Sequence, residues 1–277
     1  TIPVQIQPRR AGDPAILIAD NTQAKEQLHW RPEKTLTDAI QSAWKWEKNR
    51  EEQKPRTPHQ NIIPIVFAVD DNYALMLAVT LQSLVENTSA QHNYRIYILI
   101  EKLSELNQWI LSDIVKTYPN IHLEFINVTS LLDETTKAKC HIEIHVTLAT
   151  YFRFFIARLF KQYPKIIYLD SDIIIRKDLG DLYNYELNDN WIGAVFDIRE
   201  SIAVTQQLTV SNRNWKHYVT QTLGLQNPDD YFQAGVLLIN VKAFIENQIE
   251  EKLFSALSRI GNPILSDQDI LNAVCVG

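Results

Sequence analysis

The residues best suited to chemistry are two aspartates, Asp170 and Asp172, which directly follow the apolar run 166–169. In extended chain, side chains two positions apart point to the same side, so these carboxylates converge. Converging carboxylates repel each other unless a cation lies between them, and hard oxygen ligands favour Mg²⁺ or Mn²⁺. Asp-x-Asp also occurs by chance in surface turns, but its position after a buried strand favours a metal site. A metal in such a place commonly holds a diphosphate and neutralises charge on the leaving group.

A second polar cluster, Asp70, Asp71 and Asn72, follows the apolar run 62–69. Two interpretations stay open. The cluster is either a strand-end turn in which Asn72 caps a helix starting at Tyr73, or part of a nucleotide site at the sheet edge.

A third cluster lies in the string 265–272 and contains Asp267, Gln268 and Asp269. Acidic residues in the first turn of a helix complement its dipole, so helix capping alone would explain this cluster. The histidines His141 and His145 are four apart but lie in a strand-like alternation, which disfavours a zinc site. With only seven glycines and no glycine-rich loop in the chain, we expect phosphates to be held by a metal and by side chains.

The elements that would position these clusters alternate along the chain. Apolar runs predict strands at 62–69, 95–100, 121–128, 166–169, 173–175, 191–196 and 236–239. Helical spacing predicts helices from residue 73, over 106–114 and over 147–160. This alternation predicts an α/β fold with a mostly parallel central sheet flanked by helices. Such sheets bind ligands beyond the carboxyl ends of their strands, where Asp170 and Asp172 fall.

Composition excludes several classes of protein. The chain has 277 residues, 45% of them hydrophobic and 22% charged, which is typical of a globular protein. A formal charge of -6 and a pI of about 5.7 argue against nucleic-acid binding. No apolar run is long enough to span a bilayer. The two cysteines, Cys140 and Cys275, predict a reducing compartment and serve as small buried apolar residues.

The polar stretch 51–61 contains two prolines and predicts a linker between a first piece, 1–50, and a second, 62–277. In the first piece we expect a strand at 15–19 and a helix near 36–44 capped by Thr35 and Asp38. Trp44 and Trp46 are expected to pack on a helix face. Because residue 1 is Thr and the only methionine is Met76, we expect a piece of a longer protein at both ends.

Four strings in the second piece carry a resemblance: 65–73, 145–153, 168–172 and 267–272. In this order they resemble the family 8 glycosyltransferases, which are retaining enzymes of the GT-A fold that use nucleotide-sugar donors. The resemblance implies Mn²⁺ (or Mg²⁺) at Asp170 and Asp172. It also implies donor contacts, from uracil to sugar, by Ala68, Asp70, Asn72, Arg153, Asp170, Ser171, Asp172, Asp197, Gln233, Ala234 and Asp267. Asp267 would hold the transferred sugar, Gln268 would lie beneath its anomeric carbon, and His145 would lie toward the acceptor.

Two positions depart from the family pattern. Gln233 stands where the family usually has Asn, which lengthens a sugar contact by one methylene. The family's third metal ligand is a histidine near the C-terminus, and no histidine follows His217. We therefore expect the metal site of this chain to be incomplete and its C-terminus to be truncated.

Residues 1–50 resemble the C-terminal tail of bacterial UDP-glucose 4-epimerases, through the strings 8–14, 19–20, 28–32 and 43–46. By this resemblance Arg10 and Asp13 would contact the UDP diphosphate and ribose, and an epimerase domain would lie upstream. An epimerase that interconverts UDP-glucose and UDP-galactose could supply a fused transferase at high local concentration. This favours UDP-galactose as donor, with UDP-glucose as the alternative.

These observations predict a metal-dependent retaining hexosyltransferase that moves galactose or glucose from a UDP-sugar to a glycan acceptor such as lipopolysaccharide. We expect front-face attack, with the departing phosphate taking the acceptor proton. The expected location is the cytoplasm at the inner face of a bacterial membrane, with peripheral association through a C-terminal segment.

Two alternatives remain open. A haloacid-dehalogenase-type phosphatase also places Asp-x-Asp after a strand, but it needs Thr or Val where Ile174 stands. The other alternative is an inactive fragment that binds UDP-sugar without turning it over.

Overall fold

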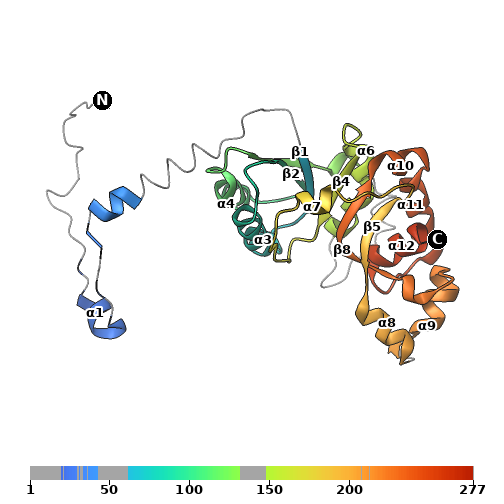
Figure 1. Ribbon diagram of the computed structural model, residues 1–277. Helices are drawn as coiled ribbons and strands as arrows, with labels where there is room; N and C mark the ends of the chain where they lie inside the picture. Colours follow the sequence, from blue (N-terminus) through green and yellow to red (C-terminus); the bar gives the residue numbers. More distant parts are fainter. Residues whose placement is uncertain are drawn as a thin grey trace. The chain divides into compact units, whose positions relative to one another are not determined.

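The computed structural model describes residues 20, 22–29, 31, 34–35, 37–42, 62–131, 148–206, 208–211 and 213–276. The chain divides into two units, Thr1–Gln53 and Lys54–Gly277, and each is described by itself (Figure 1).

In the first unit, α1 spans Thr22–Leu28 and a further helical segment spans 37–42. The predicted cap of this second segment is present. Thr35 Oγ1 accepts the Asp38 backbone N–H (3.2 Å), and the Asp38 carboxylate accepts the Thr35 backbone N–H (2.8 Å). The strand predicted at 15–19 and the two tryptophans predicted to pack beside this helix lie outside the described residues.

The second unit is built on a six-stranded sheet with the order β3-β2-β1-β4-β8-β5. Neighbours among the first four strands are parallel, whereas β8 runs antiparallel to both β4 and β5. This confirms the predicted α/β fold with a mostly parallel sheet. In sheet order the strands are β3 (Ile121–Asn127), β2 (Asn93–Ile100), β1 (Ile62–Ala68), β4 (Lys165–Leu169), β8 (Phe232–Asn240) and β5 (Ile192–Phe196).

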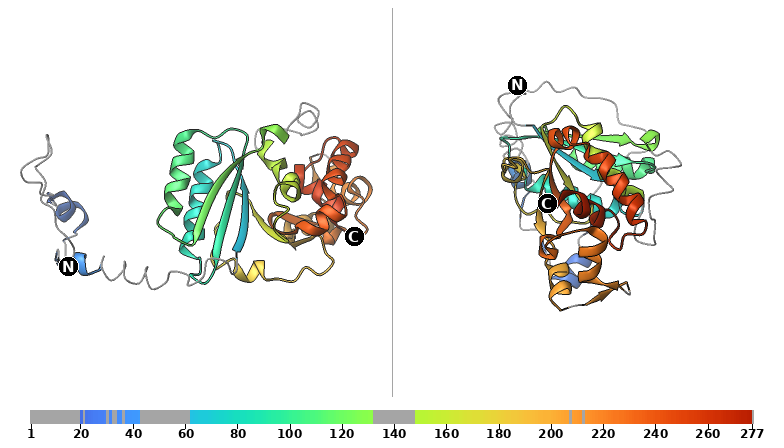
Figure 2. Two further views of the ribbon diagram at one scale, coloured as in Figure 1. Left: turned by 90° about the horizontal axis from the view of Figure 1, so that it is seen from above. Right: turned by 90° about the vertical axis from the view of Figure 1, so that its right-hand side faces the viewer.

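Both faces of the central strands are buried, because successive β1 side chains enter different cores. Ile65 and Phe67 pack with α3 (Ala74–Glu86) and α4 (Glu105–Val115), whereas Val66 and Ala68 pack with helices on the other face. Figure 2 shows helices on either side of the sheet. The helices of the second face are η2 (Leu148–Phe155), α6 (Ile156–Leu159), α10 (Val241–Glu246), α11 (Ile249–Ile260) and α12 (Ser266–Cys275).

A third, smaller core forms around Trp215, Tyr218 and Tyr231. The sequence did not predict its helices, because most of them are too short to show a periodic pattern. Its helices and the remaining short elements are η1 (Thr129–Leu131), α7 (Gly180–Tyr183), α8 (Ile198–Thr205), β6 (Thr209–Val210), β7 (Arg213–Asn214), α9 (Trp215–His217), the π-helix η3 (Tyr218–Leu223) and η4 (Pro228–Asp230).

The strand predicted at 173–175 is wrong, because this segment forms its backbone hydrogen bonds with side chains of α3 and of its C-cap, Asn87. Thr80 Oγ1 donates to the carbonyls of Ser171 (2.8 Å) and Ile173 (2.7 Å). Ser83 Oγ accepts the Ile175 N–H (2.9 Å), and Asn87 Nδ2 donates to the Ile175 carbonyl (3.1 Å). The segment is therefore fixed to a helix and does not pair with a strand.

Two predicted helices also differ, one in where it starts and the other in its type. The first helix of the second unit begins at Ala74 with Tyr73 as its N-cap, so Asn72 does not cap it. Instead, Asp70 Oδ1 accepts the N–H groups of Asn72 (2.9 Å) and Tyr73 (3.3 Å). The helix predicted over 147–160 is a 3-10 helix up to Phe155, and only α6 is α-helical.

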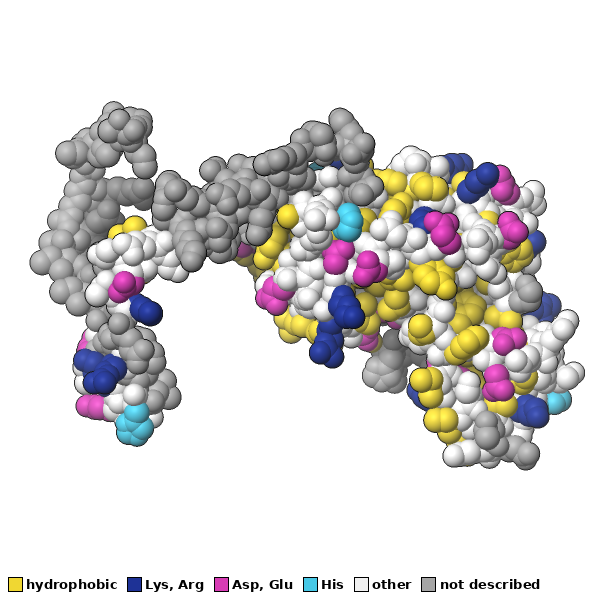
Figure 3. Space-filling view, in the orientation of Figure 1, with side chains coloured by type: hydrophobic (Ala, Val, Ile, Leu, Met, Phe, Trp, Pro, Cys, Tyr) yellow, Lys and Arg dark blue, Asp and Glu magenta, His cyan; other side chains and the backbone are white. Residues whose placement is uncertain are grey.

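Apolar side chains gather on the surface over β5 and α8 (Figure 3). Val195, Phe196 and Ile198 are each more than 60% exposed there. None of the helices in the described part of the chain combines the length and the apolar character needed to cross a bilayer.

Candidate functional site

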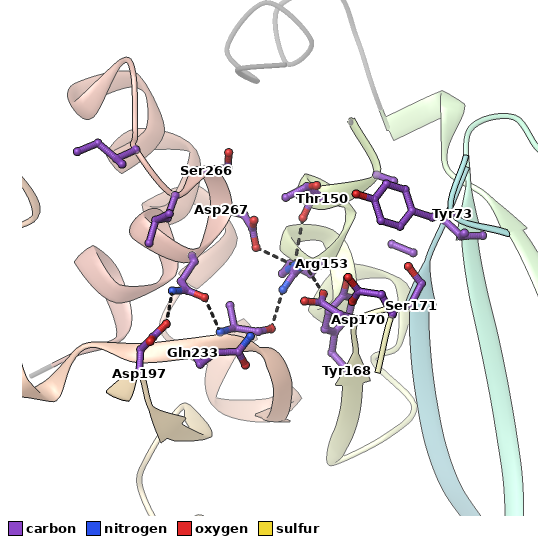
Figure 4. A pocket seen from close by; sticks show the side chains of 18 of the residues that line it. Tyr73, Thr150, Arg153, Tyr168, Asp170, Ser171, Asp197, Gln233, Ser266 and Asp267 are labelled. Atoms are coloured by element: carbon purple, nitrogen blue, oxygen red, sulfur yellow. Dashed lines mark hydrogen bonds and ion pairs between the residues drawn. The ribbon is translucent and has the colours of Figure 1, made fainter. Parts of the chain in front are cut away.

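A pocket of about 440 Å³ opens where β1 and β4 end and α12 begins (Figure 4). It brings together eleven of the residues predicted for the site: Ala68, Asp70, Arg153, Asp170, Ser171, Asp172, Asp197, Gln233, Ala234, Asp267 and Gln268. Asn72 is exposed and is not among the lining residues, whereas His145 lies outside the described residues. The geometry gathers these side chains, and their individual roles remain predictions.

Arg153 lies at the centre of the pocket wall and is only 6% exposed. Its Nη1 donates to the Ala234 carbonyl (2.6 Å), its Nη2 to Asp170 Oδ1 (2.8 Å) and its Nε to the Thr150 carbonyl (3.1 Å). The guanidinium also lies 4.2 Å from the centre of the Tyr168 ring. Burial opposes its charge, but Asp267, Tyr168 and Asp170 raise the pKa of Arg153, so it stays cationic.

Asp267 faces Arg153 from the first turn of α12 and is 5% exposed. Its Oδ2 lies 2.9 Å from Arg153 Nε as an ion pair but has no hydrogen-bond partner among the described residues. Burial raises the pKa of Asp267 to about 7, against the lowering effect of Arg153. The preceding Ser266 has a φ of 47°, in the left-handed region that non-glycine residues rarely adopt. Helix capping alone therefore does not account for Asp267.

Gln268 is fixed at both ends of its amide. Its Oε1 accepts the Ala234 N–H (2.9 Å), and its Nε2 donates to Asp197 Oδ2 (3.0 Å). The other oxygen of Asp197 caps α8 by accepting the N–H groups of Arg199 (3.1 Å) and Glu200 (3.3 Å). This chain of bonds ties α12, β8 and α8 together at the pocket.

Asn272, one helical turn beyond Gln268, continues the same contact. Its Oδ1 accepts the Phe232 N–H (2.8 Å), and its Nδ2 donates to the Phe232 carbonyl (2.8 Å). Two amide side chains of α12 therefore bond the backbone of β8 at Phe232 and Ala234.

The two aspartates of the predicted metal site lie at the mouth of the pocket. One oxygen of Asp170 is held by Arg153, and its Oδ2 lies over Gly235, where an added Cβ would come within 2.7 Å. Asp172 is exposed. Within the described ranges, no group of three or more His, Cys, Asp or Glu side chains could hold a metal. Two carboxylates nevertheless fit a hard cation that completes its shell with water and phosphate oxygens.

Two other predicted donor contacts also serve the local fold. Asp70 accepts two N–H groups of the turn before α3, as expected if it stabilises a strand-end turn. Asp70 also lines the pocket. Gln233 Oε1 folds back to accept the Gly235 N–H (2.7 Å). Any sugar contact by Gln233 would use its Nε2.

Sequence reasoning missed two polar residues at the site. Thr80 is fully buried and holds the backbone of the Asp170–Asp172 segment, and its position on the apolar stripe of α3 was an available signal. Glu200 lines the pocket with 1% of its surface exposed, and its Oε2 has no hydrogen-bond partner in the described part of the chain. Glu200 lies three residues after Asp197, which is the spacing of an ordinary helix cap, so the sequence did not mark Glu200 as a site residue.

Comparison with known proteins agrees with this geometry. Residues 64–277 match the family described as Glycosyl transferase family 8. The lipopolysaccharide 1,2-glucosyltransferase of Escherichia coli is 26% identical over 212 residues, which are 75% of this chain and 57% of that protein. The chain spans about three fifths of the length of such curated relatives.

Solved structures share the fold. The WbbM bifunctional glycosyltransferase in its apo form is 31% identical with a TM-score of 0.70, over 80% of this chain and 39% of that one. Galactosyltransferase LgtC in complex with donor and acceptor sugar analogs is 28% identical with a TM-score of 0.61, over 77% of this chain and 70% of that one.

These likenesses confirm the predicted glycosyltransferase fold. The family match covers nearly all of the second unit, including the pocket and the whole sheet except the first two residues of β1. The chain therefore belongs to glycosyl transferase family 8.

Proposed function

We propose that this chain is the catalytic part of a retaining hexosyltransferase that moves galactose or glucose from a UDP-sugar to a glycan acceptor. The observation that carries the proposal is buried Arg153, which joins Asp170 at the pocket mouth to Asp267 at its inner wall. A donor would need both ends, one for its diphosphate and one for its sugar. The names of the E. coli relative and of LgtC support a hexose donor and a saccharide acceptor.

The diphosphate end would lie at Asp170 and Asp172, with Ser171 between them. Mn²⁺ (or Mg²⁺) bound there would neutralise the charge that builds on the UDP leaving group. Arg153 orients the Asp170 carboxylate through its 2.8 Å bond and adds a fixed positive charge behind it. Ala68 and Asp70, at the end of β1, would receive the uridine.

The sugar end would lie between Asp267 and Asp197, on the side of the pocket opposite Tyr73 (Figure 4). Asp267 Oδ2 lacks a hydrogen bond, so a sugar hydroxyl that donates to it would satisfy a buried oxygen. Gln268 is held by Ala234 and Asp197 and would support the sugar from below. Attack from the front face, with the departing phosphate taking the acceptor proton, requires no further base from the chain.

UDP-galactose is the proposed donor, with UDP-glucose as the alternative, because of the epimerase-like segment 1–50. The proposed place of action is the inner face of a bacterial membrane, because of the name of the lipopolysaccharide enzyme. Family membership argues against the phosphatase alternative. The other alternative, a fragment that binds UDP-sugar without turning it over, is distinguished by the experiment below.

The test combines calorimetric titration of UDP, with and without Mn²⁺, with assays of UDP-galactose and UDP-glucose turnover. We expect UDP binding to require Mn²⁺ and to be lost in Asp172→Asn, which removes an exposed charge without touching Arg153. Asp189→Asn is the matched control, because Asp189 is exposed outside the pocket. Equal turnover by both variants would contradict the metal role. Mn²⁺-dependent binding without turnover would identify the inactive fragment.

A further inference from the structure

Asp269 is a fully buried carboxylate that is not among the residues lining the pocket. Three donors meet its two oxygens. Tyr231 Oη donates to Oδ1 (2.6 Å), and Tyr218 Oη (2.7 Å) and the Leu265 N–H (2.8 Å) donate to Oδ2. Both oxygens are therefore occupied, and Asp269 cannot act on a substrate without breaking these bonds.

The three donors come from separate parts of the second unit. Tyr218 begins the π-helix η3, Tyr231 immediately precedes β8, and Leu265 lies in the turn before α12. Tyr218 Oη also accepts the Ile264 N–H (3.2 Å). Asp269 and Tyr218 thus hold two consecutive backbone N–H groups of the turn at 264–266, and this turn lines the pocket.

The turn determines where Asp267 points. Ser266 is held at a φ of 47°, a conformation that persists in a non-glycine residue only when its surroundings impose it. Before Ser266, Tyr218 and Asp269 accept the N–H groups of Ile264 and Leu265. After it, Asp267 pairs with Arg153 and the Gln268 side chain bonds Ala234. The Gln268 N–H also donates to the Leu265 carbonyl across Ser266 (3.0 Å). Without the Asp269 contacts, Ser266 could relax and Asp267 would move away from Arg153.

We infer that Asp269, together with Tyr218 and Tyr231, is a positioning group that holds Asp267 and Gln268 in place for the sugar. This inference rests on the proposed function. A misplacement of about 1 Å at a reacting centre can lower a rate by about a hundredfold. The uridine end of the pocket is built from β1, so it should not depend on this network. The network therefore acts on the turnover of bound donor and leaves UDP affinity unchanged.

The experiment measures kcat for UDP-sugar hydrolysis, KM for the donor, and Kd for UDP with Mn²⁺, in Asp269→Asn and Tyr231→Phe. Asp269→Asn keeps the shape of the side chain but offers one acceptor oxygen to three donors. We expect kcat to fall at least about tenfold in this variant, with UDP Kd within about twofold of the wild type. Tyr231→Phe removes one hydroxyl and should lower kcat less. The double variant should lose less than the product of the two single losses, because both changes act on one network.

Tyr97→Phe is the matched control. It removes a different tyrosine hydroxyl bond, the 2.7 Å contact between Tyr97 and Tyr163, which is not part of the pocket. It should lower the melting temperature and leave kcat unchanged. If the Asp269 and Tyr231 variants lose stability but keep wild-type kcat, Asp269 is structural only and the inference is overturned. If the wild type itself neither binds UDP nor turns over donor, the proposed function fails instead.

Discussion

Gly235 and Asp170 are matched in shape and in hydrogen bonding. The Gly235 carbonyl accepts the Asp170 N–H (2.8 Å), and a Cβ on Gly235 would lie 2.7 Å from Asp170 Oδ2. Because Arg153 holds the other oxygen of Asp170, the carboxylate cannot simply rotate away. A glycine at position 235 is thus what lets this carboxylate occupy the pocket mouth.

Gly235→Ala is expected to displace Asp170 and to weaken Mn²⁺-dependent UDP binding by about tenfold or more, which is about 1.4 kcal/mol. Calorimetric titration of UDP with Mn²⁺ measures this loss. Gly224→Ala provides the control. Gly224 has a φ of 90° and open space around it, so alanine there costs about 1–2 kcal/mol of folding stability without touching the pocket. Equal UDP affinity in both variants would contradict the steric argument.

Thr80→Val is expected to destabilise the segment 170–173, which carries Asp170 and Asp172. The substitution keeps the shape of a buried side chain but leaves the carbonyls of Ser171 and Ile173 without their donor, at a cost of about 1–3 kcal/mol. Chemical denaturation should show this loss, and calorimetry should show weaker UDP binding with Mn²⁺. In the control Thr220→Val, the lost bond is a local one to the Lys216 carbonyl, so UDP binding should not change. Thr80 has no role at the site if its variant binds UDP like the wild type.

Glu200→Gln is expected to stabilise the fold above about pH 5. Burial raises the pKa of Glu200 above its unfolded value of 4.5, so the folded state favours the protonated carboxyl. The wild type therefore loses stability as the pH rises from 4.5 through the folded pKa, whereas glutamine does not titrate. The gain should be present at neutral pH and should vanish below the unfolded pKa.

Urea denaturation at a series of pH values measures this difference. Glu246→Gln is the matched control, since Glu246 is exposed and pairs with Lys242 only at 3.8 Å. A surface pair of this kind contributes roughly 0–1 kcal/mol, and its loss should not stabilise the protein. A Glu200→Gln variant that is less stable than the wild type at neutral pH would show that the charged form is favoured.

Cys275 is expected to resist thiol reagents in the folded protein. Burial raises the pKa of its thiol to about 12, so almost no reactive thiolate is present at neutral pH. Iodoacetamide labelling at pH 7.5 followed by peptide mass spectrometry should leave Cys275 unmodified until denaturant is added. The side chain is partly exposed, so rapid labelling of Cys275 in the native protein would mean that its thiol ionises more readily than this pKa allows.

The sequence predicted those strands and helices whose apolar residues form a clear local pattern. The apolar runs of β1 and β4 located the strand ends correctly, and with them Asp70, Asp170 and Asp172. The same rule failed at 173–175, because apolar residues there suggest a strand while Thr80, Ser83 and Asn87 take their backbone bonds. No local sequence pattern reveals that helix side chains, and not a neighbouring strand, will accept and donate these backbone hydrogen bonds.

The inner wall of the pocket could not be predicted for a similar reason. Asp269 meets Tyr218 and Tyr231 across 51 and 38 residues of chain, and such contacts leave no periodic trace. The π-helix at Tyr218 adds an irregular segment that helical spacing does not describe. The family resemblance identified Asp267 and Gln268 as site residues, but it did not predict the side-chain contacts that hold them in place.

The docking of α12 on β8 has a consequence for how this region can change. Gln268 and Asn272 are about 6 Å apart along the helix axis, and their partners Ala234 and Phe232 are about 6.7 Å apart along the strand. These two spacings are nearly equal, so both amide side chains can bond the β8 backbone at the same time. Inserting one residue between them would turn the second amide by about 100° and break the match. An insertion or deletion within 232–234 or within 268–272 would break this match, so length variation should fall outside these two short segments.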